Sequence, residues 1–118
     1  MAYKGNIKNI TLKNNYFRKV IFTSKQQQLV VMSLKPHQEI GSEKHKNTSQ
    51  FIRVEQGSGL AVIGDATYRL NDDSVVLIPS GIKHNIIAGK FGMKLYTIYS
   101  PPEHPKDTIE KQQDVNIH

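Results

Sequence analysis

The sequence predicts an all-β domain that closes into a barrel, and three observations support this fold class. Short segments rich in β-branched and aromatic residues follow one another along most of the chain. Turn residues separate these segments at close intervals, as in β-sandwiches and barrels, and helical periodicity is almost absent. The length of 118 residues suits one domain over 1–118. We place the barrel core at about 16–100 and a proline-rich end and short tail at 101–118.

The expected elements are short strands joined by turns. Glycine at 56–59 and 63–65 supplies the positive φ that hairpins need, and clusters of turn residues occur at 71–73 and 90–92. We therefore expect nine strands, at 17–24, 28–34, 39–44, 50–55, 60–63, 67–70, 74–78, 85–88 and 93–99.

The chain changes character after Tyr99. Three prolines in the run 100–105 remove backbone donors and fix φ, so the sheet should end there. Asp107 followed three residues later by Glu110 is a capping pattern that predicts a short terminal helix. His104 lies in the stiff proline segment, which we interpret as a surface linker, with a lid over the barrel mouth as the alternative. His118 is terminal and expected to be disordered.

Composition and charge exclude several classes of site and partner. The chain has no cysteine, which excludes disulfides, iron–sulfur clusters and thiolate zinc sites. Its net charge of +6 is concentrated before the first acidic residue, Glu39, but the lysines are spread out, so we expect a solvated surface and no nucleic-acid partner. No apolar run approaches the roughly 20 residues that span a bilayer. We expect a cytoplasmic protein without a membrane partner.

Alternation along the expected strands directs several polar side chains into the barrel. In the 39–44 strand, Glu43 and the following His45 share the inward face. Gln50 shares a face with the apolar Ile52, and His84 follows a turn that leads into the next strand. Buried carboxylates without partners are costly, so this placement favours a bound cation or a water-filled pocket.

These side chains predict a metal site of nitrogen and oxygen ligands. His45, Gln50 and His84 are the expected ligands, with Glu43 or Asn47 completing the shell. The set suits one divalent ion such as zinc, iron, manganese or nickel, and its identity stays open. Asn47 is also an ordinary turn residue, and we favour that interpretation. Because Gln50 is neutral, a weaker or more Lewis-acidic ion is expected than with a carboxylate ligand.

Two blocks of the chain resemble the two motifs of the cupin superfamily. The second motif, Pro-x-Gly-x-x-His, is matched residue for residue at Pro79, Gly81 and His84. The first is matched at its first histidine, His45, and at its closing glycine, Gly57. Asn47 stands where a second histidine is usual, and Gln50 stands where a glutamate is usual. The resemblance covers about 28–105 and implies a double-stranded β-helix, or jelly-roll, barrel.

The chain also looks like a group of small single-domain cupins that resemble mannose-6-phosphate isomerase. That resemblance implies an enzyme in which the metal polarises a carbonyl while Glu43, the catalytic residue, moves a proton between neighbouring carbons. The expected substrate is a small molecule, with an anionic sugar phosphate favoured because Lys44 and Lys83 should lie near the mouth. Arg53 alternates to the opposite face from Gln50, so we place it outside the pocket.

Two other functions stay open. One is an iron-dependent dioxygenase, which needs open coordination positions on the metal. The other is a non-catalytic binding module for a sugar or small ligand, favoured by the two departures from the first motif, at Asn47 and Gln50. We also expect a homodimer, because small barrels often cover an exposed sheet edge by association.

Overall fold

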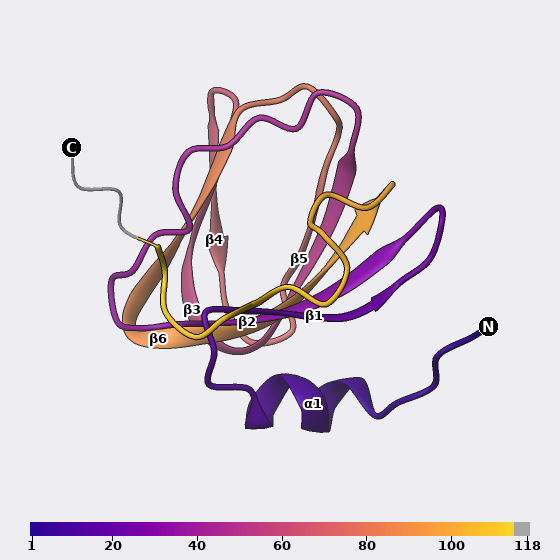
Figure 1. The fold of residues 1–118 in the computed structure, drawn as a ribbon. Helices are drawn as coiled ribbons and strands as arrows, with labels where there is room; N and C mark the ends of the chain where they lie inside the picture. The colour runs from indigo at the N-terminus through magenta and orange to yellow at the C-terminus, as the bar shows by residue number, and fades with distance from the viewer. Residues whose placement is uncertain (115–118) are drawn as a thin grey trace.

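The fold is an antiparallel barrel with one helix packed outside it. The computed structural model describes residues 1–114, so the prediction for His118 lies outside them. Its elements are α1 (Ile7–Lys13), β1 (Arg18–Thr23), β2 (Gln28–Leu34), β3 (Ser49–Ile63), β4 (Ala66–Leu70), β5 (Val75–Ile78), β6 (His84–Ser100) and β7 (Ile109–Glu110). Figure 1 shows the strands curving round a common axis, with α1 below them. The predicted all-β class is confirmed.

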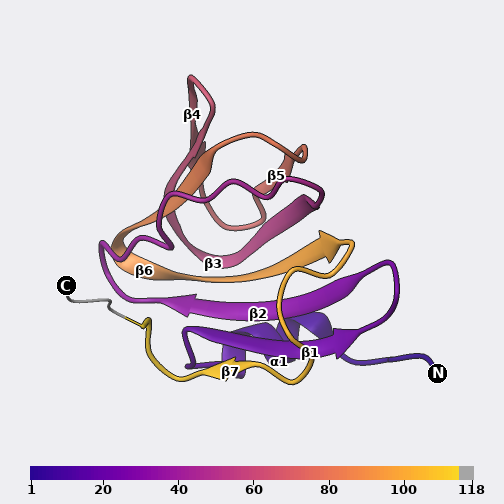
Figure 2. The same ribbon diagram turned by 45° about the horizontal axis from the view of Figure 1, so that its top comes forward.

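One seven-stranded sheet contains all the strands. Its order is β4-β3-β6-β2-β1-β7, and β5 pairs with the first half of β3. Every pairing is antiparallel. In Figure 2, β5, β3, β6, β2 and β1 follow one another round the barrel wall. The two long strands β3 and β6 pair along almost their whole length and form the centre of the sheet.

The hairpin predicted at 56–59 and the turn predicted at 90–92 are wrong, because a single bent strand runs through each site, β3 through the first and β6 through the second. Gly57 (φ 111°) and Gly92 (φ 78°) use their positive φ within β3 and β6. The β3–β6 register shifts beside Gly57, which marks bulges that bend the strands. A Cβ at Gly57 would lie 2.3 Å from the carbonyl oxygen of Gly92, so glycine also permits the close approach of the two backbones.

The strand predicted at 39–44 is also absent. Only two isolated bridges occur there, Glu39 with Ile87 and Glu43 with His84. Gly41, between them, has a φ of 115°, which breaks the regular ladder. Its N–H is donated to the side-chain Oδ1 of Asn85 in β6 at 2.9 Å instead of to a main-chain carbonyl. The segment 35–48 is therefore an irregular connection laid along the first half of β6.

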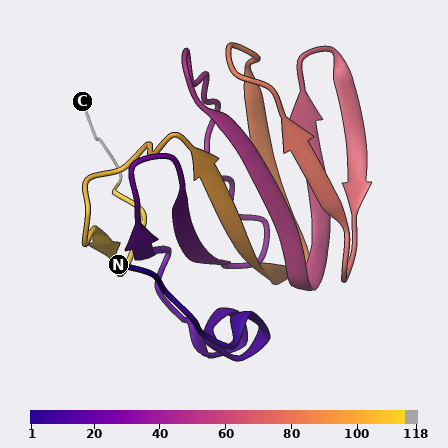
Figure 3. The same cartoon turned by 90° about the vertical axis from the view of Figure 1, so that its right-hand side faces the viewer.

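The helix α1 was missed by the sequence prediction. Asn6 caps it by accepting the N–H of Asn9 at 3.0 Å, and Thr11 is fully buried against the barrel. Figure 3 shows the helix outside the sheet, on the side of β1 and β2. The helical pattern in the sequence was weak because a helix of 7 residues makes only about two turns, which give too little periodicity to detect.

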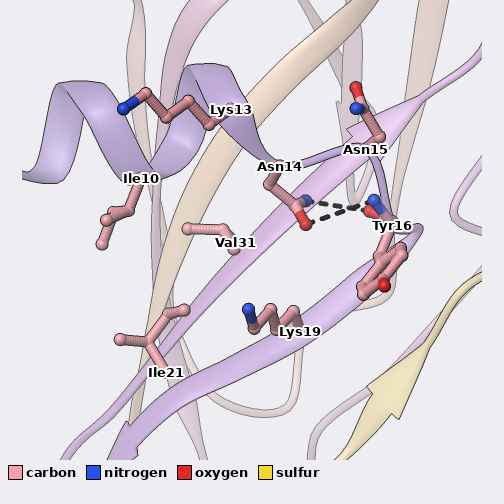
Figure 4. A pocket seen from close by; sticks show the side chains of 8 residues that line it. All are labelled: Ile10, Lys13, Asn14, Asn15, Tyr16, Lys19, Ile21 and Val31. Atoms are coloured by element: carbon pink, nitrogen blue, oxygen red, sulfur yellow. Dashed lines mark hydrogen bonds between the residues drawn. The ribbon is translucent and has the colours of Figure 1, made fainter.

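Lysine and asparagine side chains fix the end of α1. The Lys94 ammonium group donates to the carbonyl oxygens of Leu12 and Asn14, both at 2.7 Å, where a helix leaves acceptors unpaired. Burial lowers the pKa of Lys94 from its ordinary value. Asn14 exchanges two hydrogen bonds with the main chain of Tyr16, as Figure 4 shows beside a groove of about 390 Å³ between α1 and β1.

The predicted terminal helix is wrong, since Ile109 and Glu110 form the short strand β7 on the edge of β1. Asp107 does not act as a helix cap and has a φ of 67°. A 2.6 Å ion pair between Arg18 and Glu110 favours the strand, as does the bond from the N–H of Val20 to the carbonyl of Thr108 at 2.9 Å.

Apolar side chains fill the barrel except around one polar cluster. The predicted alternation of β3 is confirmed: Gln50, Ile52 and Val54 are buried, whereas Arg53 is directed outward and pairs with Glu55 and Asp73. The buried apolar core is contributed mainly by Phe17, Val20, Val30, Met32, Leu34, Ile52, Val54, Ala61, Ile86, Met93 and Leu95.

No helix in the described residues is long and apolar enough to cross a membrane.

Candidate metal centre

The predicted site residues come from two different kinds of structure. Gln50 lies at the start of β3 and His84 at the start of β6, both within the sheet. Glu43 and His45 lie in the irregular segment 35–48, which is attached to β6 by paired main-chain bonds of 2.8 Å between Glu43 and His84. The carbonyl of His45 accepts the N–H of Gly81 at 2.7 Å. These bonds bring the side chains of Glu43, His45 and His84 together.

Both imidazole rings are oriented through their Nδ1 atoms. In His84, Nδ1 lies 2.9 Å from the carbonyl oxygen of Ile82. In His45, Nδ1 lies 3.3 Å from Oε1 of Glu103. A carbonyl only accepts hydrogen bonds, so a neutral His84 ring carries its proton on Nδ1 and presents a free lone pair on Nε2. His45 has a carboxylate beside each ring nitrogen, Glu103 at Nδ1 and Glu43 at Nε2.

Three acceptor atoms in this cluster are buried without a hydrogen-bond partner among the described residues: Nε2 of His45, Nε2 of His84 and Oε1 of Gln50. The amide of Gln50 donates to the Thr97 hydroxyl at 3.0 Å, which leaves its oxygen facing away from that contact. Each buried polar atom without a partner costs about 1–3 kcal/mol. A cation bound between the two imidazoles would satisfy both Nε2 atoms.

Glu43 lies beside both free imidazole nitrogens. Its Oε1 is 3.6 Å from Nε2 of His45 and 4.0 Å from Nε2 of His84, and ligand atoms of the three residues all lie within 4.8 Å of one another. Metal–ligand bonds of about 2.0–2.2 Å place two ligands of one ion up to about 4.4 Å apart, so small side-chain movements would suffice. Glu43, His45 and His84 thus form a group that could hold a metal ion.

The remaining predicted residues lie outside this group. Asn47 is exposed, as expected for a turn residue, and Arg53 is on the outer face. Lys44 and Lys83 are exposed next to the site in sequence. Gln50 is buried and its oxygen is unpaired, so its role as a ligand stays a prediction based on position.

Sequence reasoning missed an aromatic and charged layer behind His45. Tyr99 is buried and packs edge-on against His45 (5.7 Å between centroids) and against His104 (5.1 Å). Burial raises the pKa of Tyr99 well above its ordinary value. Burial, with the charge of Arg18 as a smaller cause, lowers the pKa of His104 to about 4. His104 is therefore half-buried against the site and not on a free linker.

Arg18 and Glu103 belong to the same layer. Arg18 is 8% exposed, shares the inner face of β1 with Val20 and pairs with Glu110. Alternation with Val20 is the signal that could have found it. No such signal existed for Glu103, because its position depends on how the proline segment folds back.

Comparisons with known proteins agree with this architecture. Residues 30–99, more than half of the chain, match the family model described as "Cupin domain". An uncharacterized protein of Acanthamoeba polyphaga mimivirus is 44% identical over 92% of this chain and 71% of its own length. The uncharacterized protein YrkC of Bacillus subtilis is 42% identical over 90% of this chain, which spans 61% of that relative.

A solved structure extends the agreement to three dimensions. The crystal structure of a Bacillus halodurans protein superimposes with a TM-score of 0.92 and 34% identity, covering 95% of this chain and 90% of that one. The matched family model spans both blocks that carry His45, Gln50 and His84. The chain therefore belongs to the cupin family.

Proposed function

We propose that the protein binds one divalent transition-metal ion through His45, His84 and Gln50 and uses it in acid–base chemistry on a small anionic substrate. The observation that carries this proposal is that Nε2 of His45 and Nε2 of His84 are both buried without a hydrogen-bond partner among the described residues and lie close together beside Glu43. Oε1 of Gln50 is likewise buried and unpaired, and a folded chain rarely keeps such atoms without compensation. Two imidazoles and one amide oxygen suit zinc, iron, manganese or nickel.

The proposed reaction is an aldose–ketose isomerisation of a sugar phosphate, as the resemblance to mannose-6-phosphate isomerase suggests. A bound metal ion polarises a carbonyl group. Glu43, whose side chain is 27% exposed and so more accessible than the histidines, removes a proton from the carbon beside that carbonyl. It then returns this proton to the former carbonyl carbon, while the proton of the adjacent hydroxyl group is transferred through solvent to the former carbonyl oxygen, so that the adjacent carbon becomes the new carbonyl. Lys44 and Lys83 attract the phosphate group.

Metal binding is tested first, by elemental analysis of the purified protein and by titration of the metal-free protein with zinc, iron(II), manganese or nickel. We expect one ion per chain in the wild type and loss of that ion in His45→Ala and His84→Ala. His37→Ala is the matched control, because His37 is exposed on a turn. Absence of stoichiometric metal under all four conditions would overturn the proposal.

The reaction is tested separately in the metal-loaded protein. Proton NMR in deuterated water should detect exchange at C2 of a hexose 6-phosphate together with formation of its isomer. Glu43→Gln should abolish exchange while the protein still binds metal. If no hexose phosphate exchanges or isomerises in the wild type, the isomerase assignment fails although the metal site stands.

A binding module is the second candidate, favoured by the neutral Gln50 and the exposed Asn47 at positions where many cupins have charged or imidazole ligands. A sugar phosphate that raises the melting temperature without forming a product would support it. Oxygen consumption with iron(II) and a candidate substrate would instead favour the dioxygenase.

A homodimer is also proposed. Val75 and Leu77 on β5, together with Tyr68 on β4, leave large apolar side chains exposed on one side of the barrel. A second copy covering them would remove this surface from water. Light scattering should give twice the mass of the chain, and Leu77→Lys should shift the protein toward monomer.

A further inference from the structure

The C-terminal strap, which we define as residues 101–110, supplies a contact to His45 that the barrel itself does not provide. Glu103, in this strap, directs Oε1 to Nδ1 of His45 at 3.3 Å. The corresponding atom of His84 is held by a main-chain carbonyl, that of Ile82. Each candidate ligand thus has an oxygen atom beside its Nδ1, but only for His45 does that oxygen belong to a side chain.

The strap is held in place by a buried glutamine. Gln28 is completely buried, and its Oε1 accepts the N–H groups of both Glu103 (3.1 Å) and His104 (3.0 Å). Its Nε2 donates to the carbonyl of His104 at 2.7 Å and to the hydroxyl of Thr23 at 3.0 Å. All hydrogen-bonding capacity of this amide is used. The backbone that carries Glu103 is therefore fixed with respect to β2.

Two further contacts fix the strap beyond Glu103. The next residue, His104, packs edge-on against Tyr99, which itself packs edge-on against His45. Farther along, Glu110 pairs with Arg18 at 2.6 Å at the edge of the sheet. Glu103 reaches His45 from a segment anchored to β1, β2 and β6, so the 3.3 Å contact is part of a built arrangement.

We propose that Glu103 is a positioning residue for the metal centre: it accepts the Nδ1 proton of His45 and so directs Nε2 of that ring toward the ion. This inference rests on the proposed function, since it assigns a role toward the metal. Carboxylate groups behind a metal-bound histidine fix its tautomer and orientation, and their loss commonly weakens metal binding by 10–100-fold. The strap is thereby part of the site and not a surface tail.

The test measures metal affinity by competition between a chelator and cobalt(II), whose visible spectrum also reports ligand geometry. Glu103→Ala should weaken cobalt(II) binding at least tenfold and change the spectrum. Glu103→Gln, which keeps an oxygen acceptor for the Nδ1 proton, should restore most of the affinity. Lys106→Ala is the control, because Lys106 is an exposed residue of the same strap. Unchanged affinity and spectrum in Glu103→Ala would overturn the inference.

A second measurement uses the metal-free wild type, so it requires neither a bound metal nor a correctly folded variant. In the nitrogen-15 spectrum of the metal-free wild type, the Nδ1 proton of His45 should be observable and protected from exchange with water. Its absence would overturn the role of Glu103 even if the metal proposal holds. If instead the wild type binds no cobalt(II) but this proton is protected, the metal proposal fails and Glu103 orients His45 for another purpose.

Discussion

The candidate site joins two regions that are held together in different ways. The β3–β6 ladder delivers Gln50 and His84 through regular main-chain hydrogen bonds that continue along both strands. The two peripheral segments, 35–48 and the C-terminal strap, deliver Glu43, His45 and Glu103. In the periphery, side-chain amides add to scattered main-chain bonds: Asn85 contacts the first segment and Gln28 contacts the strap.

The ladder therefore contributes most to the stability of the fold, and the periphery positions Glu43, His45 and Glu103. A ladder bond is one of many in a cooperative array, so no single hydrogen bond is essential to it. The peripheral segments are held by fewer, scattered bonds, so the loss of one side-chain amide removes a larger share of them. Changes in the ladder should therefore affect global unfolding, and changes to the tethers should affect the site first.

The largest expected effect is in the ladder. Gly57→Ala should lower the free energy of unfolding by about 3–5 kcal/mol, because a positive φ costs about 1–3 kcal/mol and a backbone clash adds a similar amount. The added Cβ would meet the carbonyl oxygen of Gly92 at 2.3 Å, and two paired backbones cannot separate cheaply. Urea denaturation measures this loss.

Gly41→Ala is the matched change in the periphery. Gly41 also has a positive φ, 115°, but nothing lies within 4 Å of the position of its Cβ. The expected loss of unfolding free energy in this variant is therefore only the backbone strain of a positive φ, about 1–3 kcal/mol. Equal losses of unfolding free energy in the two variants would contradict the distinction between the regions.

The second effect concerns the tether of the strap. Gln28→Leu removes four hydrogen bonds and leaves buried groups of residues 103–104 without partners, so the free energy of unfolding should fall by about 2–4 kcal/mol. Metal affinity should fall with it, because Glu103 loses its fixed position. Gln27→Leu, at the exposed neighbouring residue, should change neither quantity. A loss of stability with unaltered metal affinity would separate the strap from the site.

Sequence patterns predicted the ladder better than the periphery, for a physical reason. The inward placement of Gln50 follows from strict alternation with Ile52, and β2 was predicted with its observed bounds, Gln28–Leu34. Strand alternation is a local property that is visible in a few residues. His84 was likewise found from its short motif. The prediction divided each of the long strands β3 and β6 into two shorter ones, because a glycine in a bulge and a glycine in a turn look alike in sequence.

The periphery depends on contacts between residues far apart in the chain. Glu103 reaches His45 only because Gln28 holds the strap, and no local pattern reveals that bond. The inward direction of Glu43 was predicted from alternation along a strand that does not exist. Its side chain nonetheless lies in the cluster, because the bridge to His84 holds it there.

The third effect tests the tether of segment 35–48. Asn85 accepts the N–H of Gly41 at 2.9 Å and donates to Glu39 at 2.7 Å. Asn85→Ala should lower the free energy of unfolding by only about 1 kcal/mol, because the site is partly exposed. Hydrogen exchange should accelerate at the amides of Gly41 and Glu43 while amides in the centre of β3 keep their protection. Uniform acceleration would show that the segment and the ladder open together.

The last expected effect, which appears only as the pH is lowered, is a dependence of stability on pH through His104. Burial lowers its pKa from 6.5 to about 4 in the folded protein, with Arg18 and His45 acting in the same direction and Glu110 opposing them. The unfolded chain therefore binds more protons than the folded one in this range. Stability should be fully retained above pH 6.5 and should decline as the pH falls toward about 4.

Replacing the ring isolates this contribution from those of other titrating groups. His104→Phe keeps an aromatic edge against Tyr99 but cannot bind a proton, so its unfolding free energy should fall less steeply over the same interval than that of the wild type. Urea denaturation of the metal-free proteins at several pH values measures both slopes. Equal slopes in the two proteins would mean that His104 adds no pH dependence of its own. The folded protein would then bind a proton at His104 as easily as the unfolded chain, because the strap admits water around the ring. The periphery would in that case differ from the ladder in mobility as well as in its bonding.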